Sequence, residues 1–239
     1  DDAGITPDKH KYPYPLDLGD GSILVACQVH DDGTSQRIIR VYKRAADGSL
    51  TSVNLRTWST VFSAAFAADN HPILIKREDG SILCLFFFED IEQELINLAV
   101  YRSKDDGASF TEISRTALNS TISVHASTGY TISRMRGASL GGQILLFIET
   151  VHNNGSVTKR NQLFQFSSID GGGNFDQVTT ANTLDDHSFF QIDCFTRNNE
   201  FVLTYIAKTN EAHYMILPQA FHSAAIIRTA SKYQVITTE

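Results

Sequence analysis

The sequence predicts an all-β fold built from a repeated unit of about 60 residues. Four segments, each a tight turn followed by an apolar run, recur at nearly equal intervals; they are residues 20–24, 79–83, 141–146 and 198–203. Short runs rich in β-branched and aromatic residues fill the chain between them, and clusters of Gly, Asp and Asn separate most of these runs. The repeat therefore determines the fold class more strongly than any single residue does.

Each of these runs has the length and composition of a β-strand. In chain order the predicted strands are residues 22–28, 37–43, 72–76, 81–88, 94–102, 110–114, 143–150, 161–167, 191–196, 200–206 and 213–217, with 222–227 a candidate for a last one. Residues 90–98 also fit an amphipathic helix. The matching stretch of the first unit, residues 36–41, is strand-like, so the repeat favours a strand there.

Each unit is predicted to be a four-stranded antiparallel meander. A single meander cannot bury both of its faces, but copies arranged around an axis bury them against one another, which is the arrangement of a β-propeller. The four predicted blades span approximately residues 12–57, 70–116, 130–180 and 187–235, within one domain of residues 1–239. They form either part of a larger ring or a ring of few blades.

Composition argues against several classes of partner. The 239 residues are 42% hydrophobic and 20% charged, as expected of a globular protein with a core. The net charge of −7 argues against a nucleic-acid partner. The longest apolar run, residues 82–88, is too short to span a bilayer, so no membrane insertion is expected. Asp1 and Asp2 do not begin a basic, apolar leader, so we expect no targeting peptide.

The three cysteines each lie in an apolar, strand-like run. Cys27, Cys84 and Cys194 lack the short spacing of a zinc site and do not suggest a disulfide framework, so we predict buried free thiols. We expect no metal and no cofactor.

The turns that join the third and fourth predicted strands carry the most specific motif in the sequence. Residues 103–110 (SKDDGASF) and 168–175 (SIDGGGNF) both read Ser-x-Asp-x-Gly-x-x-aromatic. In such a turn the Asp accepts hydrogen bonds from backbone amides, the Gly supplies a positive φ, and the aromatic re-enters the core. The motif residues, which we expect to be structural, are Ser103, Asp105, Gly107, Phe110, Ser168, Asp170, Gly172 and Phe175. Residues 43–50 contain a shorter, degenerate copy without the aromatic.

These two motifs resemble the Asp-box, or BNR repeat, of the sialidase (neuraminidase) superfamily, and the resemblance covers about residues 12–217. The resemblance implies a β-propeller with the Asp-boxes on the face away from the active site. Since sialidases have six blades and this chain supplies four units, it also implies that the chain is part of a larger, six-bladed ring.

Much of the catalytic set implied by this resemblance is missing. Residues 12–15 (YPYP) occupy the stretch where the family has Arg-Ile-Pro. Asp31 or Asp32 lies in the loop that carries the family's general acid/base, although acidic residues are also common in solvated turns. Residues 189–190 are both Phe where a glutamate is expected, and Lys208 stands near an expected arginine, which lysine does not replace in bidentate carboxylate binding. No sialidase activity is expected.

We therefore interpret the chain as a non-catalytic propeller that binds a glycan or serves assembly in an extracellular, cell-surface or virion protein. The alternative is an exo-glycosidase of the same superfamily with a different acid pair, drawn from Asp31, Asp32 and Glu149. Polar and aromatic side chains near predicted loops and strand ends are the ligand-binding candidates: Tyr12, Tyr14, His30, Arg136, His152 and Lys208.

A geometric argument predicts which face binds a glycan or protein partner. In a four-stranded meander, the loop between strands two and three and the turn between strands three and four leave at opposite ends. The longer loops therefore lie opposite the Ser-x-Asp turns, and variable loops commonly carry recognition. These loops are residues 28–33, 89–93, 150–160 and 207–212, of which the third is the longest.

Overall fold

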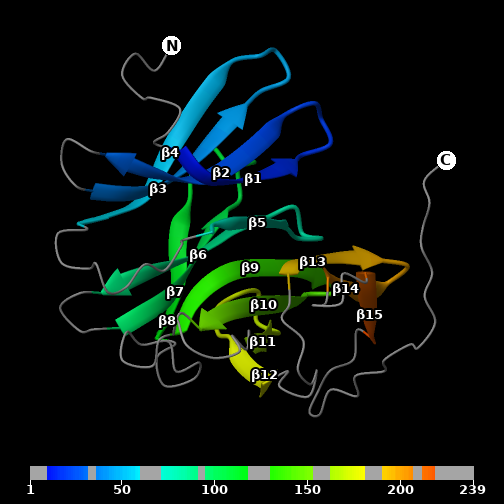
Figure 1. Ribbon diagram of the computed structural model, residues 1–239. Helices are drawn as coiled ribbons and strands as arrows, with labels where there is room; N and C mark the ends of the chain where they lie inside the picture. The colour runs from blue at the N-terminus through cyan, green and yellow to red at the C-terminus, as the bar shows by residue number, and fades with distance from the viewer. Residues whose placement is uncertain are drawn as a thin grey trace.

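The computed structural model is an all-β protein (Figure 1). The structure describes residues 10–31, 36–59, 71–90, 95–117, 130–152, 162–180, 190–206 and 212–218. Within them lie the strands β1 (His10–Asp17), β2 (Ile23–Asp31), β3 (Gln36–Arg44), β4 (Leu50–Ser59), β5 (Ile73–Lys76), β6 (Ile82–Asp90), β7 (Leu95–Ser103), β8 (Thr111–Ala117), β9 (Tyr130–Leu140), β10 (Gln143–His152), β11 (Gln162–Ser168), β12 (Asp176–Thr180), β13 (Phe190–Arg197), β14 (Glu200–Ile206) and β15 (Ala212–Pro218).

Four antiparallel sheets follow one another along the chain, and we call them blades 1 to 4. Their strand orders are β1-β2-β3-β4, β5-β6-β7-β8, β9-β10-β11-β12 and β13-β14-β15. The first strands of successive blades lie beside one another, because β1 contacts β5, β5 contacts β9, and β9 contacts β13. The prediction of a β-propeller with four-stranded antiparallel blades is confirmed, and blade 4 shows three strands within the described residues.

Several strands depart from the sequence pattern for identifiable reasons. Residues 95–103 form β7, so the strand favoured by the repeat is correct and the helix is wrong. The pattern missed β9, which contains two arginines and a glycine. Gly137 is required there, since a Cβ on it would lie 2.8 Å from the carbonyl oxygen of Leu145 on β10. The pattern also missed β1, whose prolines are tolerated because this strand is a sheet edge.

The core lies between the blades. One buried cluster joins blades 1 and 2, with Leu24 and Ile39 packed against Phe86 and Phe88. A second cluster joins blades 2 and 3, with Phe87 on one side. Because β6 contributes to both clusters, residues 82–88 are buried on both faces of the strand. This burial explains why β6 is a continuous apolar run rather than an alternating one.

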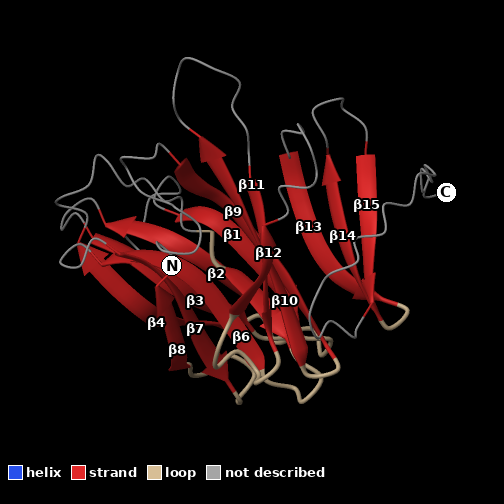
Figure 2. Cartoon of the chain, turned by 90° about the horizontal axis from the view of Figure 1, so that it is seen from below, coloured by secondary structure: helices blue, strands red, loops and turns tan. Residues whose placement is uncertain are grey.

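Most of the described turns gather at one end of the sheets, in tan in Figure 2. We call this end the turn face; it carries the turns that join the first strand of a blade to the second and the third strand to the fourth. The first strands of the blades start at the other end and run towards the turn face. His10 and Tyr130 therefore mark the far end of the axis, and Asp17 and Leu140 mark the turn face.

Candidate functional site

Side chains from three blades meet near the propeller axis. The guanidinium of Arg136 (β9) lies over the ring of Tyr14 (β1), with Cζ 5.4 Å from the ring centroid. The Nε atom of the same arginine lies 3.7 Å from Oδ1 of Asp193 (β13). Since β1, β9 and β13 are the first strands of their blades, this meeting point follows directly from the propeller arrangement. We call Tyr14, Arg136, Asp193 and Glu149 the axial cluster.

A β-bulge in β1 determines the direction of Tyr14. Lys11 pairs with Gln28 and Tyr14 pairs with Ala26, so β1 advances by three residues while β2 advances by two across the bulge. Because strand side chains alternate between faces, one extra residue moves everything beyond it to the opposite face. His10 accordingly reaches the outer face of blade 1, where its Nε2 lies 2.8 Å from the Tyr42 hydroxyl. Tyr14 faces inward and packs against both buried clusters.

Arg136 is held by contacts along its side chain. Its Nη1 donates a 2.7 Å hydrogen bond to the carbonyl oxygen of Met135. Burial lowers the pKa of Arg136, whereas the nearby Tyr14 and Asp193 act in the opposite direction. An arginine remains protonated throughout the physiological range, so Arg136 presents a fixed positive charge. Burial also raises the pKa of Tyr14, which keeps its phenol neutral and able to donate a hydrogen bond.

Two carboxylates border this arginine in different surroundings. Glu149 (β10) is only 3% exposed and pairs in register with Arg134 (β9), so the two share a face of blade 3. Glu149 also interacts electrostatically with Arg136. Asp193 is 60% exposed, and its Oδ1 accepts a 2.9 Å hydrogen bond from the Cys194 amide. The site thus combines two guanidinium groups with one buried and one solvated carboxylate.

The other predicted ligand-binding residues are dispersed. Tyr12 contacts His71 near the far end of the axis, with the two rings tilted and their centroids 3.9 Å apart. His30 is half-buried in β2, where it pairs with Arg37 of β3. Asp31 and His152 end strands β2 and β10, but their side chains lie outside the described residues. Asp32, Lys208 and most of the four loops predicted to bind a partner also lie outside the described residues.

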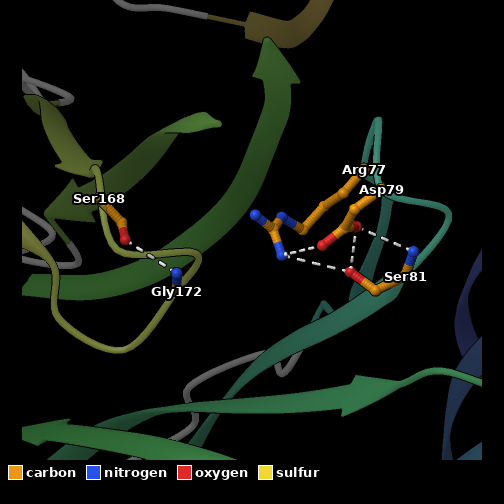
Figure 3. Close-up of polar contacts among 5 residues, drawn as sticks. All are labelled: Arg77, Asp79, Ser81, Ser168 and Gly172. Atoms are coloured by element: carbon orange, nitrogen blue, oxygen red, sulfur yellow. Dashed lines mark hydrogen bonds and ion pairs between the residues drawn. The ribbon is translucent and has the colours of Figure 1, made fainter. Parts of the chain in front are cut away.

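The Ser-x-Asp turns lie on the turn face and form closed local networks. In the turn of blade 2, Ser103 Oγ donates to Asp105 (2.7 Å) and accepts from the Gly107 amide (2.8 Å), while the Ser109 amide donates to Asp105 (2.9 Å). The turn of blade 3 repeats this pattern with Ser168, Asp170, Gly172 and Asn174. Figure 3 shows the bond from the Gly172 amide to Ser168.

These networks also determine the charge state of the two turn carboxylates. Hydrogen bonds from Ser109 lower the pKa of Asp105 to about 2. Partial burial opposes the same shift in Asp170, but hydrogen bonds from Asn174 dominate and lower its pKa to about 2. A carboxylate with so low a pKa stays ionised at neutral pH and is a poor proton donor.

Sequence reasoning missed Asp193, which completes the axial cluster. A signal exists in its neighbours, because Ile192 and Cys194 are both buried and a charged residue between them marks the polar face of an inner strand. Among the described residues, no group of three or more His, Cys, Asp or Glu side chains could hold a metal ion. No helix in the same part of the chain is long and apolar enough to cross a membrane.

Comparisons with known proteins define the fold but not the ligand. The chain is similar to the GH93 α-L-arabinofuranosidase of Fusarium graminearum in complex with arabinobiose (TM-score 0.57, 13% identity, 94% of this chain and 66% of that one). It is also similar to the α-L-arabinanase of Penicillium chrysogenum complexed with arabinobiose (TM-score 0.56, 12% identity, covering 90% of this chain and 64% of that one). A third similar structure is the α-L-arabinofuranosidase of Podospora anserina in complex with cellotriose (TM-score 0.51, 12% identity, covering 91% of this chain and 66% of that one). No family model matches the chain, and no curated protein matches its sequence.

The chain thus spans about two thirds of the length of these solved structures. At such low identity the likeness shows the β-propeller fold and not a shared activity. The neighbours are arabinan-related glycosidases, so the propeller part of the predicted resemblance is confirmed, whereas its attribution to sialidases stays a prediction.

Proposed function

We propose that this chain is a carbohydrate-binding β-propeller whose ligand site is the axial cluster. The observation that carries the proposal is the meeting of Tyr14, Arg136 and Asp193 from three different blades. Polar groups that converge from separate elements, and that are not needed to hold one strand to the next, are typical of a binding site. The buried residues between the blades are mostly apolar, so this group of partly buried and exposed polar side chains stands apart from the core beside it.

The chemistry of the cluster suits a sugar. The guanidinium offers several N–H donors, the phenol donates and accepts, and the carboxylates accept from hydroxyl groups. The 3.7 Å separation between Arg136 Nε and Asp193 Oδ1 is longer than an ordinary hydrogen bond, so the two groups form an ion pair without a direct hydrogen bond between these atoms. A hydroxyl inserted between them would bond to both groups. The glycosidase neighbours add support for a glycan ligand at the level of the fold.

A second candidate function is glycoside hydrolysis by the same cluster. The observation that favours it is the presence of one buried and one exposed carboxylate, Glu149 and Asp193, beside one arginine. Two carboxyl groups in unlike surroundings are the usual starting point for an acid and base that add water across a glycosidic bond. Asp31 and Asp32 remain alternative partners in such a pair. That the chain binds a protein partner in an assembly stays a prediction.

The test is a sugar panel screened by saturation-transfer NMR and then titrated by calorimetry. The panel contains arabinobiose, xylobiose, cellotriose and 3′-sialyllactose. We expect the wild type to bind at least one member and Arg136→Ala to weaken that binding by at least about tenfold, which is about 1.4 kcal/mol.

Arg197→Ala provides a matched control, because this exposed arginine lies on β13 at the turn face. It should bind like the wild type. Equal binding by Arg136→Ala and the wild type contradicts the proposed site. Release of reducing sugar by the wild type, abolished in Glu149→Gln, would favour hydrolysis over binding alone.

A further inference from the structure

We propose that Tyr12 and His71 form an aromatic subsite for a neutral sugar ring, on the far side of the axial cluster from the turn face. This inference rests on the proposed function, because it names a second contact for the same ligand. It adds a substrate class, a neutral oligosaccharide, and a residue, His71, that the axial cluster does not include.

The two rings come from different blades and lie close together. Tyr12 belongs to β1, and His71 lies two residues before β5. Their centroids are 3.9 Å apart with an interplanar angle of 47°, and both side chains are only half-buried. The contact therefore spans the junction between blades 1 and 2 and still presents aromatic surface to solvent. A sugar packs its C–H face on such a surface while its hydroxyls bond to the polar edges of the rings.

The backbone of Tyr12 is strained. Its φ is +56°, in the left-handed region that a bulky side chain rarely adopts. The other non-glycine residues with positive φ in the described chain are Asp106, Asn198 and Asn199, whose short polar side chains tolerate that region. A Gly or Asn would fit the bulge at Tyr12 more easily than a tyrosine. Residues held in such conformations cluster at binding sites, where strain positions a particular side chain.

The same bulge connects this subsite to the axial cluster. Tyr12 and Tyr14 are two residues apart on β1, at most about 7 Å along the strand, a spacing within the length of a disaccharide. Gln28 of β2 pairs with Lys11 beside the bulge and is 4% exposed. Its Oε1 has no hydrogen-bond partner within the described residues. A buried acceptor without a partner costs free energy, and one next to the bulge is consistent with a site shaped for a polar ligand.

The charge balance of the region favours a neutral sugar. The axial cluster and its neighbour Arg134 contain two guanidinium groups and two carboxylates, so their charges cancel. Tyr12 adds no cation, and neither ring provides the bidentate fork that recognises a carboxylate. At the axial cluster an acidic sugar would meet Asp193 and Glu149 without a surplus of positive charge; Lys11, beside the bulge, is the one further cation of β1. The region therefore selects by stacking and by hydroxyl contacts.

The experiment compares two glycine substitutions at positive φ. Tyr12→Gly removes the ring and fits the backbone, whereas Asn199→Gly makes the same backbone change in the β13–β14 turn, at the turn face. We titrate arabinobiose, arabinotriose, cellotriose and, as an acidic probe, 3′-sialyllactose. We expect Tyr12→Gly and His71→Ala to weaken binding of the neutral sugars by about two- to tenfold. Tyr12→Phe, which keeps the ring but loses the hydroxyl, should weaken binding less than Tyr12→Gly does, and Asn199→Gly should bind like the wild type.

The outcomes separate the two proposals. Wild-type affinity in both Tyr12→Gly and His71→Ala, together with loss of binding in Arg136→Ala, overturns the subsite and leaves the proposed function standing. Preferential binding of 3′-sialyllactose overturns the neutral-sugar class. A wild type that binds no sugar of the panel overturns the proposed function and the subsite with it. If Tyr12→Gly does not fold, His71→Ala decides, because His71 lies outside the strands.

Discussion

The turns between the third and fourth strands differ between blade 1 and its two successors. In blades 2 and 3 these turns contain the full Ser-x-Asp-x-Gly-x-x-aromatic motif and lie against the preceding blade. A Cβ on Gly107 would come within 2.7 Å of Leu24 in blade 1, and one on Gly172 within 3.3 Å of Leu83 and Val100 in blade 2. Ser114 of blade 2 also donates a 2.7 Å hydrogen bond to the Gly172 carbonyl oxygen.

The corresponding turn of blade 1 packs against nothing comparable. A Cβ on Gly48 would have no atom of the described residues within 4 Å, and Leu50 is 64% exposed, whereas Phe175 of blade 3 is 7% exposed. This turn is a hairpin in which the Ser49 amide donates to Asp47 (2.8 Å) and the Ala45 amide donates to the Ser49 carbonyl oxygen (2.9 Å). The turn at residues 77–81 has the same bonds, and Figure 3 shows its Arg77, Asp79 and Ser81.

The comparison shows what the longer motif adds. The degenerate copy of the motif lies at the predicted position between β3 and β4, but its residues 45–49 form an Asp-Gly-Ser hairpin turn with different hydrogen bonds. In blades 2 and 3 the full motif places its glycine against the preceding blade, and its aromatic is partly buried in blade 2 (Phe110) and buried in blade 3 (Phe175). We infer that the motif stabilises the junction between blades as well as its own hairpin.

The largest expected difference in unfolding free energy is between two matched glycine substitutions, one in blade 2 and one in blade 1. Gly107→Ala and Gly48→Ala both place a side chain at φ near +85°, which costs roughly 1–2 kcal/mol. Only the first also drives a methyl group into Leu24, and overpacking adds about 1–3 kcal/mol. Chemical denaturation should therefore show Gly107→Ala to be the more destabilised variant. Equal losses of unfolding free energy would mean that the turn does not press on blade 1.

A smaller difference in stability is expected between variants that remove a turn carboxylate from blade 3 and from blade 1. Asp170→Ala removes hydrogen bonds from Ser168, the Asn174 amide and the Asn174 side chain, with an expected loss of about 1–3 kcal/mol. Asp47→Ala removes a hydrogen bond from the Ser49 amide at an exposed site and should cost less than about 1 kcal/mol. Thermal melts of the two variants test this order. A greater loss in Asp47→Ala would reverse the comparison.

The smallest effect is the pH dependence. The pKa of Asp105 and of Asp170 is about 2 in the folded chain, against an ordinary value of 3.8. Because the folded state binds fewer protons, these groups stabilise it above about pH 4, and the contribution is lost as the pH falls from about 4 to 2. The double variant Asp105→Asn, Asp170→Asn should show a shallower loss of stability over this window than the wild type. Asp47→Asn, in the hairpin turn of blade 1 outside the full motif, serves as the control. Parallel curves of stability against pH for the wild type and both variants would exclude this linkage.

The repeat predicted the fold because every blade needs the same kinds of residue at corresponding positions. A turn needs Asp and Gly, and a strand buried on both sides, such as β6, needs a continuous apolar run. The pattern did not predict the inner strands β1 and β9, because β1 carries two prolines and β9 carries two arginines and a glycine that lies close to the β10 backbone. Sequence periodicity reports burial, and these strands are only partly buried.

The candidate site was predicted only in part for a related reason. Tyr14, Arg136 and Glu149 were chosen as separate candidates, and their meeting depends on the β1 bulge and on which faces the strands turn to the axis. A single extra residue reverses the direction of the side chains beyond it, and the sequence around Tyr12 contains no signal that predicts this bulge. Asp193 was missed because its partner, Arg136, is 57 residues away and in another blade.

The most direct test of this account is the dissociation constant of one sugar for three proteins: the wild type, Arg136→Ala and Asp170→Ala. The sugar is the panel member that the wild type binds most tightly, titrated at a temperature at which all three are folded. We predict that Asp170→Ala melts earlier but binds within about twofold of the wild type, whereas Arg136→Ala melts similarly and binds at least about tenfold more weakly. Loss of binding in Asp170→Ala at unchanged stability, with full binding in Arg136→Ala, would place the site on the turn face and contradict the account.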